Sequence, residues 1–101
     1  MTGEAETAWV AACHEAAAQL MAASSRHGCP ERASALRDAA ASAEELAFRP
    51  DVASRAMALA CGARMGASDL GRLMSRALAR RRCAGEDPAA LVIREVSRRS
   101  S

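Results

Sequence analysis

The stretch MALACGARMGASDLGRLMSRAL, residues 57–78, contains the bend on which the interpretation of the fold depends. Apolar residues recur at helical spacing on both sides of Gly66, so this glycine predicts the end of one helix before the start of another. A bend of this kind is typical of two structures. One is a DNA-binding helix-turn-helix, and the other is a helical hairpin that supports binding to another protein.

The length and composition indicate one small helical domain spanning residues 1–101. Apolar residues make up 50% of the chain, but most of them are alanines, and the chain has one Trp, one Phe and no Tyr. The large side chains expected to form the core are Trp9, Leu20, Leu36, Leu46, Phe48, Val52, Met57, Leu59, Leu70, Leu73, Leu78, Leu91, Val92, Ile93 and Val96. A core so rich in alanine predicts modest stability for the isolated chain.

Strand signals are nearly absent, whereas helical spacing with Gly and Pro breaks predicts about five helices. They are expected from about Glu4 to His27, Pro30 to Phe48, Asp51 to Met65, Ser68 to Cys83, and from Pro88 onward. Gly28 is expected to end the first helix in the left-handed conformation, and Ser68 is expected to cap the fourth. The last residues are expected to fray. Because the connections are short, successive helices are expected to be antiparallel neighbours, which gives an all-α fold of antiparallel helical hairpins.

The charge is unevenly distributed along the chain. The net charge is only +2, yet eight arginines follow from Arg72 onward against three acidic residues. Such a basic end suits nucleic acid, a membrane or an acidic partner, although a solvated helix face has the same composition. No apolar run of 18 residues exists, so no membrane span is expected. The acidic N-terminus does not match a signal peptide, which predicts a cytoplasmic location with reduced cysteines.

No motif for catalysis, a cofactor or a metal is found. The possible metal ligands are Cys13, His14, His27 and Cys29. Residues 13 and 27 lie about 20 Å apart along a helix, so they cannot share one ion. The chain also lacks a phosphate-binding loop and a paired acid and base, so we expect no enzyme and no cofactor. Cys13, Cys61 and Cys83 are expected to be buried, and Cys29 is expected to be exposed.

A weak internal repeat favours stacked helical hairpins. The segment QLMAASSRHG (19–28) aligns with MALACGARMG (57–66) at an offset of 38 residues. Each segment closes one helix and precedes another, and repeats of this length with two helices each are typical of helical-repeat proteins. In tetratricopeptide repeats a Gly-containing turn is followed about five residues later by a small residue. Gly28 with Ala33, and Gly66 with Gly71, fit that pattern.

Four segments also resemble the YscG-type chaperones of type III secretion systems, which are small tetratricopeptide-like proteins. They are CHEAAAQLMAASSRHG (13–28), RPDV (49–52), ALACGARMG (58–66) and EDPAALVIREV (86–96). The resemblance implies a cytoplasmic chaperone that holds the amphipathic C-terminal helix of the needle subunit in a concave groove. It also implies a small helical co-chaperone as a second partner.

In tetratricopeptide-like folds the first helix of each hairpin lines the groove, which here means the first and third helices. Met21, Met57 and Met65 lie on them, and methionine side chains adapt well to a partner, although they also fill gaps in a core. The residues expected to bind the partner are Leu20, Met21, Met57, Met65, Arg72 and Arg76.

The alternative function is a helix-turn-helix DNA-binding regulator. Arg72, Arg76 and Arg80 recur every four residues after the Gly66 bend, so they are expected on one face of the helix. Such a face is suited to contacts in a DNA major groove or with phosphates.

Overall fold

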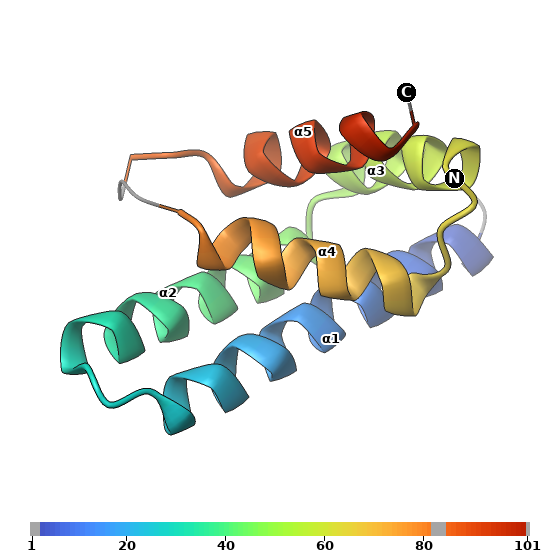
Figure 1. Ribbon diagram of the computed structural model, residues 1–101. Helices are drawn as coiled ribbons and strands as arrows, with labels where there is room; N and C mark the ends of the chain where they lie inside the picture. Colours follow the sequence, from blue (N-terminus) through green and yellow to red (C-terminus); the bar gives the residue numbers. More distant parts are fainter. Residues whose placement is uncertain (1–2, 82–84, 101) are drawn as a thin grey trace.

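The computed structural model describes residues 3–81 and 85–100, which form five α-helices and no strand (Figure 1). The helices are α1 (Gly3–Arg26), α2 (Pro30–Leu46), α3 (Pro50–Gly62), α4 (Ala67–Ala79) and α5 (Pro88–Ser100). The all-α fold with five helices is therefore confirmed. The last residues, which were expected to fray, are helical as far as Ser100. Cys83, the expected end of the fourth helix, lies outside the described residues.

The helices form two helical hairpins with α3 added on one side (Figure 1). α1 pairs with α2 in one antiparallel hairpin, and α4 pairs with α5 in another. α4 lies along α1 and also contacts α2, whereas α3 packs mainly against α5. No helix in the described part of the chain is both long enough and apolar enough to cross a membrane.

The expectation that all successive helices are neighbours is wrong for two pairs, because α2 and α3, and α3 and α4, share almost no packing. A short connection fixes the distance between helix ends, but complementary apolar faces decide which helices pack. α4 has the most apolar face to bury, and it packs on the long alanine face of α1. The 38-residue repeat therefore does not correspond to two equivalent hairpins.

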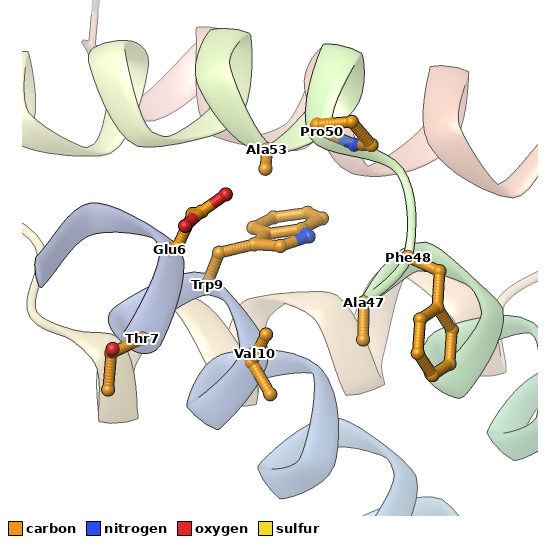
Figure 2. Close-up of a pocket in the computed structure, with 8 residues that line it drawn as sticks. All are labelled: Glu6, Thr7, Trp9, Val10, Ala47, Phe48, Pro50 and Ala53. Carbon is orange, nitrogen blue, oxygen red and sulfur yellow. The ribbon is translucent and has the colours of Figure 1, made fainter. Parts of the chain in front are cut away.

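The core is built around Trp9, which lies under the connection between α2 and α3 (Figure 2). The indole N–H of Trp9 donates a hydrogen bond of 2.7 Å to the carbonyl oxygen of Leu46, the last residue of α2. The fully buried large side chains are Trp9, Cys13, Leu20, Leu70, Met74, Leu78, Val92 and Val96. Phe48, which was expected in the core, is 84% exposed, because it follows the end of α2 and lies on the outer side of the connection.

Gly71 lies where α4 and α1 approach each other too closely for a side chain. A methyl group at Gly71 would lie 2.8 Å from Cβ of Glu15 and 3.1 Å from the carbonyl oxygen of Ala12. A small residue at this position was expected to bring two helices together, and it does so. The neighbour is α1, however, and not α3 as the repeat predicted.

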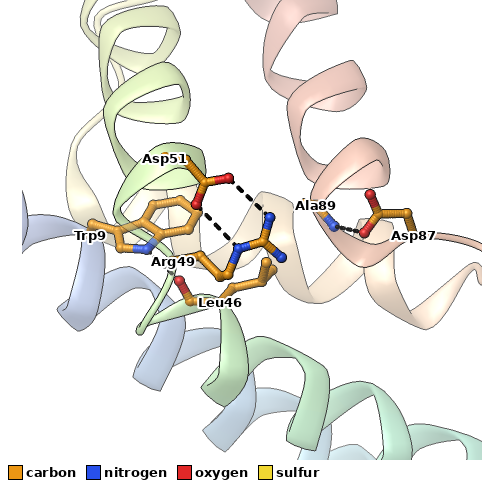
Figure 3. A network of polar contacts seen from close by, with 6 residues as sticks. All are labelled: Trp9, Leu46, Arg49, Asp51, Asp87 and Ala89. Carbon is orange, nitrogen blue, oxygen red and sulfur yellow. Dashed lines mark hydrogen bonds and ion pairs between the residues drawn. The ribbon is translucent and has the colours of Figure 1, made fainter.

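Pro30 and Pro88 open helices as predicted, and α3 begins at Pro50, one residue before the expected Asp51. Before α5, the carboxylate of Asp87 accepts the backbone N–H of Ala89 at 3.2 Å (Figure 3). Asp51, at the start of α3, instead forms two hydrogen bonds with the Arg49 guanidinium, of 3.0 and 3.2 Å (Figure 3). The hydrogen bond from Arg49 lowers the pKa of Asp51 below its usual range.

The turn between α3 and α4 is built differently from the prediction. Arg64, and not a glycine, adopts the left-handed conformation, with φ of 57°, and no described glycine has a positive φ. The N–H of Arg64 donates to Cys61 at 3.1 Å and that of Met65 to Ala60 at 2.9 Å, which is a Schellman ending. α3 therefore ends at Gly62, before the expected Met65.

Gly66 then precedes α4 in an extended conformation, and its N–H points to the Asp69 carboxylate at 3.5 Å. The expected cap at Ser68 is wrong, because Ser68 lies inside α4. The expectation of a left-handed Gly28 is also wrong. Before α4 the start of the helix is formed by Gly66 with Asp69, which leaves no capping role for Ser68.

Candidate functional site

Two grooves flank α1, one on each side. The first, which we call the apolar groove, follows the seam between α1 and α2 on the surface away from α4. It consists of two adjoining hollows of about 470 and 420 Å³. The first hollow is lined by Glu6, Thr7, Trp9, Val10, Ala47, Phe48, Pro50 and Ala53 (Figure 2). The second is lined by His14, Ala17, Ala18, Met21, Arg37, Ala40, Ala41 and Glu44.

The two hollows adjoin because their lining residues are one helical turn apart. Val10 of the first hollow precedes His14 of the second on α1, and Glu44 of the second lies on α2 shortly before Ala47 and Phe48 of the first, which follow the end of that helix. His14 Nδ1 and a Glu44 carboxylate oxygen lie 3.9 Å apart across the seam. The groove therefore runs along the hairpin and crosses one exposed polar pair.

The apolar groove carries the large apolar side chains that the fold leaves uncovered. Phe48 is 84% exposed and Met21 is 46% exposed, and no other large hydrophobic residue within 3–81 and 85–100 is classed as exposed. They lie in different hollows: Phe48 lines the first hollow, and Met21 lines the second. Alanines lie between them, so another helix can approach the surface closely.

The second groove, which we call the basic groove, runs over α4 from its seam with α1 to the α3–α4 turn and the end of α5. It consists of two hollows of about 660 and 480 Å³ that share Gln19 and Arg76. Its charged lining residues are Arg26, Arg64, Arg72, Arg76, Arg99 and Asp69. Its apolar lining residues are Leu20, Ala22, Ala23, Leu36, Ala63, Met65, Leu73 and Ala79.

A hydrogen bond from Ser75 to Gln19 ties α4 to α1 beside the basic groove, and each of these two residues has a second bond within its own helix. The hydroxyl group of the buried Ser75 contacts Gln19 Oε1 at 2.8 Å and the carbonyl oxygen of Arg72 at 2.9 Å. The Gln19 amide nitrogen then donates to Glu15 at 2.9 Å. These bonds fix the wall residues of the groove relative to each other.

One internal ion pair offsets part of the positive charge. Arg72 and Asp69 form an ion pair of 2.6 Å, one turn apart on α4. The hydrogen bond from Arg72 lowers the pKa of Asp69, and the Gly66 N–H and the Arg99 charge act in the same direction. Asp69 is therefore ionised at neutral pH.

The structure divides the six residues expected to bind a partner between the two sides of α1. Leu20, Met65, Arg72 and Arg76 line the basic groove, whereas Met21 lines the apolar groove. Met57 is half-buried against the core and lines neither groove. The Leu20 side chain is only 2% exposed, so it supports the groove floor and presents almost no surface.

Phe48, Arg64 and Arg99 are among the groove-lining residues that sequence reasoning missed. Phe48 was expected to be buried because it is the only phenylalanine in an alanine-rich chain. Arg64 and Arg99 reach the basic groove from the α3–α4 turn and from the end of α5. Only the tertiary arrangement brings them beside Arg76, so no local sequence signal identifies them.

The arginines of α4 have the exposure that their spacing predicts. Arg72 and Arg76 on α4, and Arg80 directly after its end, are all exposed, while seven other residues of α4 are buried. In a helix-turn-helix the first helix braces the second. Here α4 is braced by α1, α2 and α5 and has almost no packing with α3.

The three cysteines that the structure describes differ in burial. Cys13 is buried as expected, and burial raises the pKa of its thiol to about 12, so it is neutral at physiological pH. Cys29 is exposed as expected, but Cys61 is exposed although it was expected to be buried. Cys83 lies outside the described residues. Within 3–81 and 85–100, no group of three or more His, Cys, Asp or Glu residues is placed to hold a metal ion.

Comparison with models of protein families, with curated proteins and with solved structures gave no match. The functional interpretation therefore rests on the two grooves.

Proposed function

We propose that this chain is a non-enzymatic protein-binding module that holds an amphipathic helix of a partner in the apolar groove. The observation that carries the proposal is the position of Phe48 and Met21, exposed in the two adjoining hollows of one seam. An amphipathic helix places apolar side chains on one face, and such a face fits a groove with large residues at its ends and alanines between. Burying Phe48 alone would contribute about 2 kcal/mol.

The more specific form of this proposal is a small cytoplasmic chaperone. By the resemblance of residues 13–28, 49–52, 58–66 and 86–96, the helix would belong to a type III secretion needle subunit, and a small helical co-chaperone would bind as well. A subunit that assembles through an apolar helical face is kept monomeric when that face is covered. The modest core of this chain also fits a protein that gains stability from its partners.

The test is co-purification of the tagged chain from its own host, with variants that place a charge in the groove. Phe48→Glu and Met21→Glu each put a carboxylate on the surface that a helix would cover. Ala58→Glu is the matched control, because Ala58 is exposed on α3 and lines neither groove. We expect both groove variants to lose at least about 90% of the bound partner, since burying an unpaired charge is costly. We expect the control to retain the partner.

Two results would count against the proposal. One is equal recovery of the partner by Phe48→Glu, Met21→Glu and the wild type, with helical circular dichroism unchanged. The other is an equal loss of bound partner in Phe48→Glu, Met21→Glu and the control Ala58→Glu, which would indicate an effect of net charge. Mass spectrometry of the recovered protein then tests the secretion-chaperone form separately, because a needle subunit and a second small helical protein are its expected partners.

DNA binding is the second candidate function, favoured by the exposed row of Arg72, Arg76 and Arg80 on α4. It predicts binding to duplex DNA that weakens steeply with salt and depends on Arg76. Binding of a DNA duplex of about 15 base pairs to the wild type and to Arg76→Glu tests this function directly.

A further inference from the structure

We propose that the basic groove is a second binding site, which takes an acidic helical segment of a protein through carboxylate contacts with its arginines. This site lies on the opposite side of α1 from the apolar groove. The inference therefore does not depend on the function proposed for that groove.

The first support is the charge of the groove. Five arginines line it against one acidic residue, Asp69, which already pairs with Arg72. Arg26, Arg64, Arg76 and Arg99 have no ion-pair partner among the residues that the structure describes. Guanidinium groups bind carboxylates through two parallel hydrogen bonds, so unpaired arginines gathered on one surface favour a partner rich in Asp and Glu.

The second support is the conformation of Arg64. A left-handed residue at the end of a helix is usually glycine, and another residue there costs about 1 kcal/mol. In this chain the position holds an arginine, and its side chain lines the groove. Backbone strain of this kind is concentrated at functional sites, because the side chain that it positions is needed there.

The third support is the apolar floor, which distinguishes a protein partner from nucleic acid. Ala63, Met65 and Ala79, all half-buried, line the groove together with the arginines and have no role in binding phosphates. They suit the apolar side chains of an amphipathic helix that carries carboxylates beside them. The hydrogen bonds of Ser75 and Gln19 hold this floor in place before any partner binds.

The dimensions fit a short helix. Along α4 the groove extends from Asp69 to Ala79, which is about 15 Å or roughly three helical turns. Arg72 and Arg76 are one turn apart, so their spacing matches carboxylates at positions i and i+4 of a bound helix. A segment of about ten residues with Glu or Asp along one edge and Leu along the other would fill the groove.

The experiment measures binding of a fluorescein-labelled designed peptide to the full chain by fluorescence anisotropy. The peptide has about 15 residues, enough for partial helicity, with Leu on one face and Glu at i, i+4 and i+7 beside it. The matched probe has Gln in place of each Glu. A duplex of about 15 base pairs tests nucleic acid, and inorganic pyrophosphate tests a small anion as a competitor.

The variants separate the groove from net charge. Arg76→Glu reverses a charge shared by both hollows, and Arg55→Glu is the matched control on α3, exposed and outside the grooves. Arg76→Gln with Arg99→Gln is a milder double variant, to be used if circular dichroism shows that the reversal disturbs the fold. Phe48→Glu serves as a control in the apolar groove.

We expect the Glu peptide to bind at least about tenfold more tightly than the Gln peptide, with binding that weakens as salt is added. Arg76→Glu should weaken binding of the Glu peptide at least about tenfold. Arg55→Glu and Phe48→Glu should weaken it less than about twofold. Equal binding of the Glu and Gln peptides, binding of neither, or equal loss in Arg76→Glu and Arg55→Glu would overturn the proposal. Tighter binding of the duplex, or displacement of the peptide by pyrophosphate, would identify the groove as a phosphate site and overturn it as well.

Discussion

Replacing Gly71 by alanine tests the close packing of α4 on α1, on which both walls of the basic groove depend. The new methyl group would lie 2.7 Å from Cγ and 2.8 Å from Cβ of Glu15, and 3.1 Å from the carbonyl oxygen of Ala12. The distance to Glu15 Cβ is about 0.6 Å short of ordinary contact, and neither Cβ nor a backbone oxygen is free to turn away. The two helices must therefore move apart.

Two opposing contributions decide whether Gly71→Ala raises or lowers the free energy of unfolding. Overpacking of this kind costs about 1–3 kcal/mol. Replacing glycine by alanine inside a helix contributes about 0.5–1 kcal/mol in the other direction, because the unfolded chain loses freedom. We expect Gly71→Ala to lower the free energy of unfolding by about 1 kcal/mol, and the melting temperature by about 5 °C for a domain of this size.

Gly62→Ala is the matched control, since Gly62 is the last residue of α3 and a methyl group there meets nothing within 4 Å. It should raise the free energy of unfolding by about 0.5 kcal/mol. Both values can be measured by urea unfolding followed by circular dichroism at 222 nm, a wavelength that reports helix. If Gly71→Ala stabilises the chain as much as Gly62→Ala does, α1 and α4 are not in close contact and the reasoning is refuted.

Four further measurements test other parts of the structure. Arg64→Gly should raise the free energy of unfolding by about 0.5–1 kcal/mol, because glycine adopts the left-handed conformation without strain, and a loss of stability in urea unfolding would contradict this. Trp9→Phe should cost about 1–3 kcal/mol in the same assay, because it removes a buried hydrogen bond and part of a core side chain; an unchanged midpoint would mean that the indole is not buried. Burial raises the pKa of the Cys13 thiol from 9.0 to about 12. The free energy of unfolding should therefore keep the full contribution of this thiol below pH 9 and fall between pH 9 and 12, because the thiol ionises first in the unfolded chain. Cys13→Ala should make this fall smaller. The hydrogen bond from Arg72 lowers the pKa of Asp69 below its ordinary 3.8. The contribution of this carboxylate to the free energy of unfolding should therefore be present above pH 3.8 and be lost at lower pH. Asp69→Asn should lose less free energy of unfolding than the wild type when the pH is lowered.

The parts of the fold that sequence reasoning identified are those with local signals. Pro30, Pro50 and Pro88 fixed three helix starts within a residue or so, because proline fits only the first turn of a helix. Aspartate is a residue type that favours helix starts, and Asp87, directly before Pro88, accepts the backbone N–H of Ala89. The apolar spacing also distinguished helix from strand throughout the described chain.

The pairing of helices and the makeup of the site had no such signals. Connection length suggested that α3 and α4 form a hairpin, but the apolar face of α4 packs on α1, and Gly71 is the contact point. Arg64 and Arg99 join Arg76 only through that arrangement. Phe48 is apolar but follows the end of α2, so its exposure depends on the path of the next three residues.

The central claim, that the apolar groove holds a partner helix, is tested most directly by photocrosslinking in the host. A benzophenone amino acid replaces Phe48, which is 84% exposed, and the same amino acid at the exposed Ala58 is the control. Benzophenone reacts with C–H groups in direct contact, so irradiation records what covers each position. We predict a crosslink from position 48, and not from position 58, to an amphipathic helical segment of one partner. No crosslink at position 48, or the same products from both positions, would contradict the account.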